Sequence, residues 1–382
     1  MNLRDTPEEA AFRTGLRDWI AANRPAAANG SRPDEGAIRD WSRKLSDAGY
    51  AGLTWPKEYG GAEAPYSFQA IFLEETARAE TPPHIGVIGL GMAGPTIIAH
   101  GTPDQKERHL RKILSAEEIW CQGFSEPDAG SDLASLGTRG ELRDGHIVVN
   151  GQKVWSSFAH IADWCLLIVR TDPASLKHRG LTYVLVDMHA PGVEVRPLRQ
   201  ITGEAEFNEI FFTDVEVPLE NVLDEIGAGW SVAMTTLLHE RGTLGFTLTA
   251  VLEVQVRRLL ALARELEIDD PRLRDRIARE WIELQALKLT NLRSLTKLMR
   301  TGMPGPEGSV TKLHWSEANQ RLTKLALELM GQAAPLAEGD GVAGGYWQHQ
   351  QLRSRGNTIE AGTSEILRNI IAERVLGLPR SR

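Results

Sequence analysis

The spacing of apolar residues changes twice along this chain, and these changes limit the folds that it can adopt. Up to about residue 116 apolar residues recur every three to four positions, as in amphipathic helices. From about 117 to 222 the period is two, which is typical of strands. From about 229 the helical period returns. The sequence predicts an α+β multidomain chain: a helical domain (1–116), a β-barrel or sandwich domain (117–222) and a C-terminal domain like a four-helix bundle (223–382).

Individual elements follow from the same periods and from Gly and Pro breaks between them. We expect helices over residues 8–23, 34–49, 67–79, 103–114 and 364–373, and strands around 147–149, 164–169, 183–186 and 209–212. Asp-Gly at 144–145 and Asn-Gly at 150–151 are typical of tight hairpin turns. The segment 304–308, with its two prolines and two glycines, predicts a turn between two C-terminal helices.

Composition and charge exclude several classes of function. The net charge is -8, and Lys and Arg are dispersed, which disfavours a nucleic-acid partner. The two cysteines, Cys121 and Cys165, are too few for a disulfide framework or a paired metal site, so we expect buried thiols and no metal. The N-terminus lacks the apolar core of a signal peptide, and the longest apolar run, 85–98, is short for a membrane span. We therefore expect a cytoplasmic enzyme.

One motif points to a dinucleotide site. The segment GLGMAG at 89–94 satisfies the G-x-G-x-x-G pattern, which binds dinucleotides where it joins a strand to a helix. However, no apolar strand precedes it, Pro95 follows its last glycine, and Glu107 lies within a helical segment. We therefore interpret these glycines as positions of close helix packing.

Two other segments carry groups suited to a polar, planar ligand. The loop GFSEPDAGSDLAS at 123–135 brings hydroxyls and backbone amides together, and NGQKVWSS at 150–157 adds an aromatic face and two more hydroxyls. With TWPKEYGG at 54–61 and GTSEI at 362–366, they make the whole chain resemble acyl-CoA dehydrogenases, such as bacterial fatty-acid or steroid side-chain enzymes. The SEP loop is the most specific of these matches.

The resemblance implies FAD as cofactor and α,β-dehydrogenation of an acyl-CoA thioester to the trans-2-enoyl-CoA, a step of lipid β-oxidation, with flavin N5 as hydride acceptor. The residues implied as FAD contacts are Gln122, Phe124, Ser125, Gly130, Ser131, Trp155, Ser157, Thr363 and Glu365. The first three would flank the flavin ring, and Ser131 would lie where flavin and CoA meet. Trp155 and Ser157 would cover the other side. Thr363 and Glu365 would contact the ribityl and phosphate portion.

The family places its catalytic base in one of two positions. Directly before the near-terminal Gly-Thr this chain has Ala361, with Glu360 one residue earlier, which is about 100° away if the segment is helical. The other position is Glu240, which interrupts an otherwise apolar helical segment. A carboxylate there is costly to bury without a role. We expect Glu240 to be the base, Glu360 to be its reserve, and Arg241 to orient the base or line the substrate site. His239 is expected to pack only.

Two departures from the family bear on assembly. The usual Arg-x-x-Phe-Gly stretch is replaced by RELEI at 264–268, and the usual Gly-Gly-x-Gly by MGQA at 330–333. We expect either a heterotetramer with a related subunit or a homo-oligomer with altered cofactor contacts. Two alternatives stay open: a catalytically silent subunit of such an assembly, and an acyl-CoA oxidase or flavin monooxygenase on the same fold.

The sequence gives less information about the electron acceptor and the acyl group than about the cofactor. The resemblance implies electron-transferring flavoprotein as the acceptor. Gly242 and Gly245 would leave room for a branched or ring-bearing acyl group.

Overall fold

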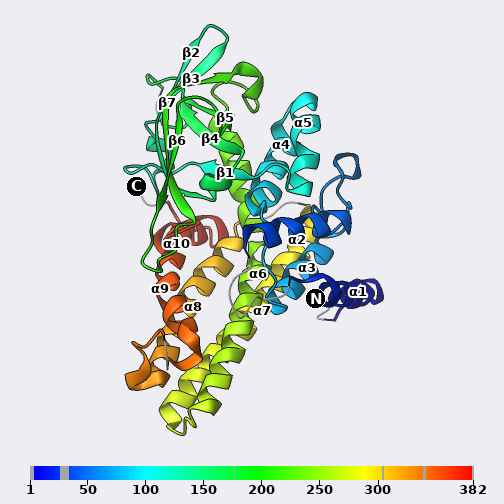
Figure 1. Cartoon of the computed structure of the whole chain (residues 1–382), viewed down its shortest axis with the longest axis vertical. Helices are drawn as coiled ribbons and strands as arrows, with labels where there is room; N and C mark the ends of the chain where they lie inside the picture. Colours follow the sequence, from blue (N-terminus) through cyan, green and yellow to red (C-terminus); the bar gives the residue numbers. More distant parts are fainter. Residues whose placement is uncertain (1–3, 26–33, 176, 303–304, 339–340, 381–382) are drawn as a thin grey trace. The chain divides into compact units, whose positions relative to one another are not determined.

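The computed structural model describes residues 4–25, 34–175, 177–302, 305–338 and 341–380, without the side chains of residues 240–244. The chain forms two compact units, and Figure 1 colours it by sequence from blue at the N-terminus to red at the C-terminus. The first comprises Met1–Ala22, Tyr66–Thr81 and Arg241–Arg382. The second comprises Asn23–Pro65 and Pro82–Glu240. Helix α6 (Gly229–Glu265) starts in the second unit and continues into the first.

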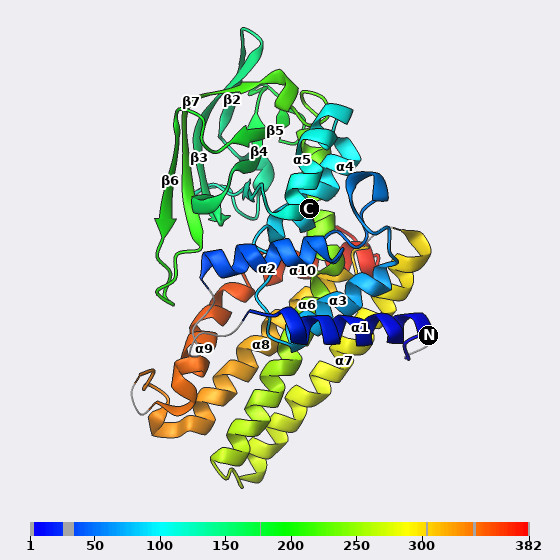
Figure 2. The same cartoon turned by 45° about the vertical axis from the view of Figure 1, so that its right-hand side comes forward.

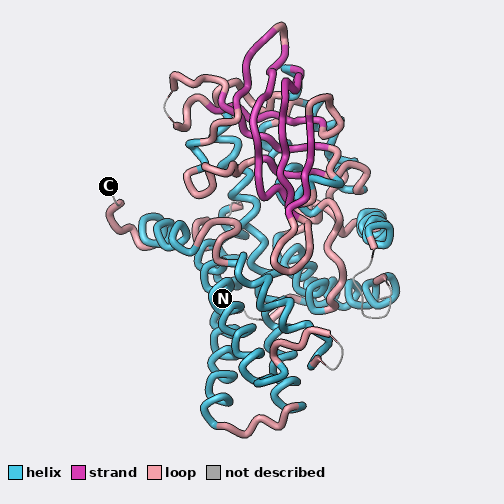
Figure 3. The backbone as a smooth tube through the Cα atoms, turned by 60° about the vertical axis from the view of Figure 1, so that its left-hand side comes forward, coloured by secondary structure: helices cyan, strands magenta, loops and turns pink. Residues whose placement is uncertain are grey.

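The second unit is built on a curled, seven-stranded sheet, drawn in magenta in Figure 3. Its strands are β1 (Trp120–Gly123), β2 (Arg139–Arg143), β3 (His146–Ser157), β4 (Trp164–Arg170), β5 (Leu181–Asp187), β6 (Val193–Leu198) and β7 (Phe207–Pro218). The order is β1-β4-β2-β3-β7-β6, and β5 also pairs with β4. β1 and β2 lie parallel to β4, whereas the other pairs are antiparallel. The predicted β-rich middle zone is confirmed.

Strands β4 and β5 carry the most deeply buried apolar side chains of the sheet. Residues 164–169 of β4 and 181–186 of β5 are all buried, as expected for strands covered on both faces. Cys121 and Cys165, which are register partners on β1 and β4, are buried free thiols, as predicted.

Helices α2 (Glu35–Asp47), α4 (Gly94–His100) and α5 (Pro103–Ser115) complete the second unit. α5 starts with a capping box between Thr102 and Gln105. The glycine motif lies in a π-helical turn, η2 (Gly89–Ala93), that runs into α4. A Cβ on Gly94 would lie 2.0 Å from the Trp55 ring, and one on Gly89 2.9 Å from Ile113. The interpretation of the glycines as positions of close packing is confirmed for Gly89 and Gly94 but not for Gly91, where nothing lies within 4 Å of a Cβ.

The first unit is helical. It contains α1 (Pro7–Asn23), α3 (Tyr66–Arg78), α7 (Pro271–Thr301), α8 (Gly308–Met330), α9 (Tyr346–Asn357), α10 (Ser364–Ile370) and the rest of α6, which are labelled in Figure 2. Leu252 of α6, Leu284 of α7, Leu322 of α8 and Trp347 of α9 share one buried core. The predicted C-terminal bundle is confirmed, and so is the turn between α7 and α8, apart from 303–304, which lie outside the described residues.

One turn prediction is wrong. Asp144 and Gly145 do form a hairpin turn, with φ of 48° and 81°, between β2 and β3. Asn150-Gly151 instead lies inside β3, where the pairing with β7 shifts register between Val149 and Gly151. Asn-Gly favours a β-bulge as well as a turn, because both need backbone conformations that most side chains resist.

Candidate functional site

The loop after β1 is tied to β3 by its backbone. The Val154 amide donates a hydrogen bond to the Ser125 carbonyl at 2.9 Å. The Lys153 ammonium donates to the Phe124 carbonyl at 3.0 Å. Ser125 therefore lies beside the segment of β3 that carries Trp155, so the two halves of the predicted flavin motif are neighbours in space.

Glu126 fixes the end of the same loop that leads into β2. Its carboxylate accepts hydrogen bonds from the backbone amides of Gly137 and Thr138, at 2.6 and 2.8 Å, and pairs with Lys153 at 2.8 Å. Burial raises the pKa of Glu126, but the Lys153 charge and these hydrogen bonds outweigh burial and hold the pKa below its ordinary value. Burial lowers the pKa of Lys153, although Glu126 opposes that effect.

Trp155 occupies a second irregularity of β3. The pairing with β7 is interrupted between Lys153 and Ser156, and Trp155 has φ of 62°. A bulky residue rarely adopts this left-handed conformation. The bulge turns the indole outward, so that Trp155 is 60% exposed, with its ring 6.1 Å from Phe207. Bulges often re-aim a side chain next to a functional site.

The remaining predicted residues of the second unit differ in accessibility. Ser125 and Ser157 are half-buried, whereas Gly130 and Ser131 are exposed. The Phe124 ring packs edge-on against Tyr183 in the core, so this residue offers a ligand its backbone. Among the described residues, the buried Nε2 of Gln122 has no hydrogen-bond partner.

The predicted C-terminal residues surround a tight loop in the first unit. Ala361 and Gly362 both have left-handed backbones, with φ of 50° and 95°. Thr363 caps α10 by accepting a hydrogen bond from the Ile366 amide at 3.2 Å. Glu365 is exposed, and hydrogen bonds from its own backbone amide and from Thr363 hold its pKa below the ordinary value.

The structure describes the side-chain contacts of only one of the two candidate bases. The Glu360 carboxylate is bonded by Arg353, at 2.9 and 3.3 Å, and by the Asn357 amide at 2.8 Å. Glu240 and Arg241 lie on α6, but their side chains are outside the described residues. His239, one residue before them, is half-buried, and burial lowers its pKa. A neutral imidazole at this position agrees with the packing role expected for it.

The groups on the second unit fit a flavin. A flavin ring is flat and aromatic with polar edges, and it needs hydrogen-bond donors along those edges and a face to stack on. The unpartnered Gln122 amide and the half-buried Ser125 and Ser157 hydroxyls supply polar groups, and the exposed Trp155 indole supplies the face.

Comparison with known proteins decides the family. Models of the acyl-CoA dehydrogenase N-terminal, middle and C-terminal domains match residues 6–117, 121–215 and 227–376. The chain belongs to the acyl-CoA dehydrogenase family. Members of this family are FAD-dependent flavoproteins of lipid β-oxidation that dehydrogenate acyl-CoA thioesters.

Several relatives match almost the whole chain. The acyl-CoA dehydrogenase IpdE1 of Mycobacterium tuberculosis is 42% identical over 97% of this chain and 97% of that protein. FadE34 of the same organism is 41% identical over 96% of this chain but only 49% of its own length. Among solved structures, the Tcur3481-Tcur3483 steroid ACAD is 30% identical, with a TM-score of 0.90 and full coverage of both chains. The ChsE4-ChsE5 complex from M. tuberculosis has 30% identity, a TM-score of 0.87 and the same coverage.

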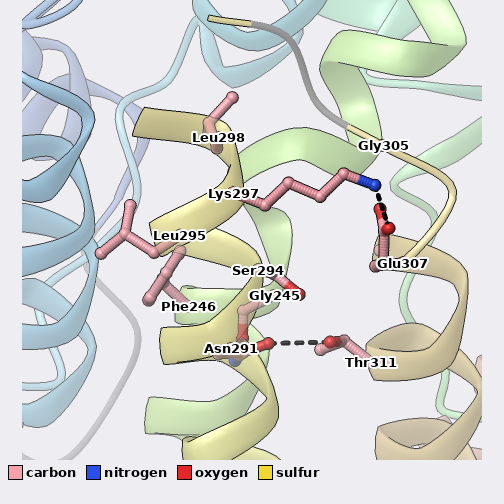
Figure 4. Close-up of a pocket in the computed structure, with 11 residues that line it drawn as sticks. Gly245, Phe246, Asn291, Ser294, Leu295, Lys297, Leu298, Gly305, Glu307 and Thr311 are labelled. Carbon is pink, nitrogen blue, oxygen red and sulfur yellow. Dashed lines mark hydrogen bonds and ion pairs between the residues drawn. The ribbon is translucent and has the colours of Figure 1, made fainter. Parts of the chain in front are cut away.

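Figure 4 shows a small cavity in the first unit of this acyl-CoA dehydrogenase, between α6, α7 and α8. Its volume is about 30 Å³, which is the space of one water molecule. Thr311 donates a hydrogen bond to Asn291 at 2.8 Å, and Lys297 pairs with Glu307. A Cβ on Gly245 would lie 3.0 Å from both Asn291 and Thr311. Gly245 therefore lies in close helix packing, whereas Gly242, the other glycine expected to leave room for the acyl group, lies outside the residues whose burial is described.

Sequence reasoning missed Lys153, Glu126 and Arg170. The Arg170 guanidinium donates to the carbonyls of Ala134 and Leu136, at 2.7 and 3.1 Å, where the loop rejoins the sheet. A signal for Lys153 was present, because the alternation of β3 places it on the buried face. Glu126 and Arg170 gave no such signal.

Within the described ranges, no group of three or more His, Cys, Asp or Glu residues is arranged to hold a metal ion. In the same part of the chain, no helix has the length and apolar character that crossing a membrane requires.

Proposed function

We propose that this chain dehydrogenates an acyl-CoA whose acyl group is ring-bearing and steroid-derived, with FAD bound at the loop and strand that carry Ser125 and Trp155. The observation that carries the flavin assignment is the exposed, strained Trp155 beside a loop fixed by Lys153 and Glu126. The substrate class is supported by the steroid ACAD, which is 30% identical over the full length.

The cofactor residues are those named from the sequence. Ser125 and Ser157 hydrogen-bond to the flavin edge, Trp155 covers its face, and Gln122 supplies a side-chain amide. Phe124 contributes its backbone, because its ring is in the core. When bound, FAD supplies the acceptor for the β-hydride, which no side chain can provide.

The remaining contacts complete this assignment. Gly130 keeps the loop surface open, since nothing lies within 4 Å of the place of a Cβ there. Ser131 contacts both flavin and CoA, and Thr363 and Glu365 contact the ribityl and phosphate portion.

Glu240 is the proposed catalytic base, with Arg241 orienting it or contacting the substrate. The α-proton of a thioester is weakly acidic, so its removal needs a carboxylate in a dry site and hydrogen-bond donors for the charge on the thioester oxygen. The observation against Glu360 is that its carboxylate oxygens already accept hydrogen bonds from Arg353 and Asn357, which compete with contact to a substrate proton.

Paired variants test the base. We expect Glu240→Gln to slow reduction of the flavin by an acyl-CoA by about a hundredfold or more, the usual contribution of a general base. Glu360→Gln is expected to keep most of the rate. If Glu360→Gln loses the rate and Glu240→Gln keeps it, the roles are reversed.

Assembly is proposed as a heterotetramer with a related subunit. Two of the matching structures are named for pairs of proteins, Tcur3481-Tcur3483 and the ChsE4-ChsE5 complex. The departures at 264–268 and 330–333 agree with cofactor contacts shared between unlike chains. Size-exclusion chromatography of the chain alone tests this: loss of FAD favours the mixed assembly, and an FAD-loaded homo-oligomer contradicts it.

Other parts of the proposal rest on the sequence: the domain limits and the compartment on apolar periodicity and composition, and the electron acceptor on the family resemblance. We place the domains at 1–116, 117–222 and 223–382, the chain in the cytoplasm, and electron-transferring flavoprotein as the acceptor. The alternative to an active dehydrogenase is a catalytically silent subunit. Reduction of the bound flavin by an acyl-CoA distinguishes the two roles.

A further inference from the structure

Two lysines of this chain are buried although the proposed reaction uses neither. Lys153 on β3 is 0% exposed and Lys312 on α8 is 3% exposed. Burying an ammonium is costly unless hydrogen-bond acceptors replace its water. In both cases the acceptors include a backbone carbonyl in a loop assigned to FAD, and the two lysines lie in different units.

Lys153 holds the first loop. Its ammonium donates to the carbonyl of Phe124, the residue directly before Ser125, and pairs with Glu126, the residue directly after it. Glu126 in turn accepts from the amides of Gly137 and Thr138. One side chain therefore fixes both neighbours of Ser125 and, through Glu126, the return of the loop toward β2.

Lys312 holds the second loop in the same way. Its ammonium donates to the carbonyl of Gly362, the residue directly before Thr363, and to that of Asn357 at the end of α9, both at 2.8 Å. It thus joins the two ends of the tight loop between α9 and α10. This loop contains Ala361 in a left-handed conformation, which costs free energy and persists only where surrounding contacts enforce it.

We propose that Lys153 and Lys312 are positioning residues for FAD: each uses a buried ammonium to fix the carbonyl that precedes a flavin-binding hydroxyl residue, Ser125 and Thr363 respectively. The inference rests on the proposed function, in which these two loops hold the cofactor. Its physical basis is preorganisation, because a loop already held in the bound conformation loses less entropy when the ligand binds. Lysine suits this role, since its apolar stem packs while its head makes charge-assisted hydrogen bonds.

Lysine-to-methionine variants test the role, because methionine keeps much of the stem and removes the ammonium. In Lys153→Met we expect the amide protons of Gly137 and Thr138 to exchange with solvent about tenfold faster or more, since their acceptor Glu126 loses its cation. Amides in the middle of β4 are expected to keep their rates. In Lys312→Met the Ser364 amide, which donates to Thr358, is expected to exchange faster, and Gly137 and Thr138 to be unchanged.

The matched control is Lys324→Met, on the same helix as Lys312 but exposed. We expect it to alter neither loop. If Lys153→Met does not fold, because Glu126 is left without its cation, the double variant Lys153→Met and Glu126→Gln removes both charges together and is measured in its place.

FAD affinity is measured on the same variants by flavin fluorescence, in the assembly that holds FAD. We expect the dissociation constant to rise about ten- to a hundredfold in Lys153→Met and Lys312→Met, the range of a lost charge-assisted hydrogen bond, and not in Lys324→Met. Unchanged exchange in both loops would overturn the proposal, as would faster exchange spread evenly over the whole chain. Faster local exchange with unchanged FAD affinity would overturn the cofactor role alone. A wild-type protein that holds no FAD in any assembly would refute the proposed function instead.

Discussion

Trp155 shows how a single residue departs from local rules at the candidate site. A regular strand would give Trp155 an extended backbone and continue the pairing with β7. Instead its backbone is left-handed and its indole is exposed. Such strain is kept only where the surrounding structure enforces it, and it gathers at functional positions. The motif predicted that Trp155 covers the flavin. It did not predict the left-handed backbone, because a register shift depends on the partner strand.

Replacement of Trp155 by glycine separates strain from function. Glycine adopts positive φ without steric cost, so we expect the free energy of unfolding of Trp155→Gly to stay within about 1 kcal/mol of the wild type. FAD binding is expected to weaken by about tenfold or more through the lost aromatic face. Denaturant unfolding and flavin fluorescence measure the two effects. Trp155→Phe serves as the control that keeps an aromatic ring, and equal FAD affinity in all three proteins would contradict the role.

His84 predicts a dependence of stability on pH. Its Nδ1 accepts a hydrogen bond from the Gly86 amide at 3.0 Å and its Nε2 lies 3.2 Å from the Leu114 carbonyl, which fixes the neutral tautomer. Burial lowers the pKa of His84 from 6.5 to about 4. Between these two pH values the unfolded chain binds a proton that the folded chain does not. Stability therefore falls as the pH is lowered from 6.5 to 4, by up to about 3 kcal/mol from this residue.

The variant His84→Gln isolates that contribution from other titrating groups. We expect its free energy of unfolding to vary less than that of the wild type between pH 6.5 and 4, although it is lower at pH 7 through lost packing. Urea unfolding at several pH values measures the difference. Parallel pH profiles for the two proteins would show that His84 is not the group responsible.

At the scale of elements, β3 is shaped by two irregularities, and the first depends on Gly151. This glycine has φ of 154°, and a Cβ would lie 2.6 to 2.8 Å from Thr138. Gly151→Ala must therefore displace Thr138, whose amide donates a hydrogen bond to Glu126. Gly15 on α1 is the opposite case, because nothing lies within 4 Å of its Cβ position and it is exposed.

These two glycines predict changes of opposite sign. Gly151→Ala is expected to lower the free energy of unfolding by about 2 kcal/mol or more, through overpacking against Thr138. Gly15→Ala is expected to raise it by up to about 1 kcal/mol, since alanine is the better helix former. Thermal or denaturant unfolding of both variants measures this. Equal effects of the two substitutions would contradict the close approach at Gly151.

The long helices and the buried strands could be predicted from the sequence because their apolar periods are clear. Helices α1, α2, α3 and α5 end within one or two residues of the expected limits. Strands β1, β2 and β6 were not predicted. β1 is only four residues long and β2 is mostly exposed, so neither shows a clear apolar alternation, whereas the alternation of Val193 and Val195 with polar residues in β6 was missed. The site residues were proposed by motif, but the buried lysines were not. Lys312 bonds backbone carbonyls, which carry no residue-type signal, and the signal of Lys153, its place on the buried face of β3, was missed.

At the scale of the whole molecule, the layout of helix, sheet and helix was predictable, but the compact units were not. Residues Met1–Ala22 and Tyr66–Thr81 belong with the C-terminal helices in one unit, while the intervening Asn23–Pro65 belongs with the sheet. Periodicity describes each segment separately and gives no information about such long-range association.

The central claim is that this chain, as an acyl-CoA dehydrogenase, holds FAD and passes it the electrons of a ring-bearing acyl-CoA. The most direct measurement is the visible flavin spectrum of the purified protein before and after anaerobic addition of steroid-derived and linear acyl-CoA thioesters. We expect the steroid-derived thioester to bleach the flavin, and Glu240→Gln to prevent the bleaching. A flavin that stays oxidised with every thioester would contradict the claim and identify a silent subunit.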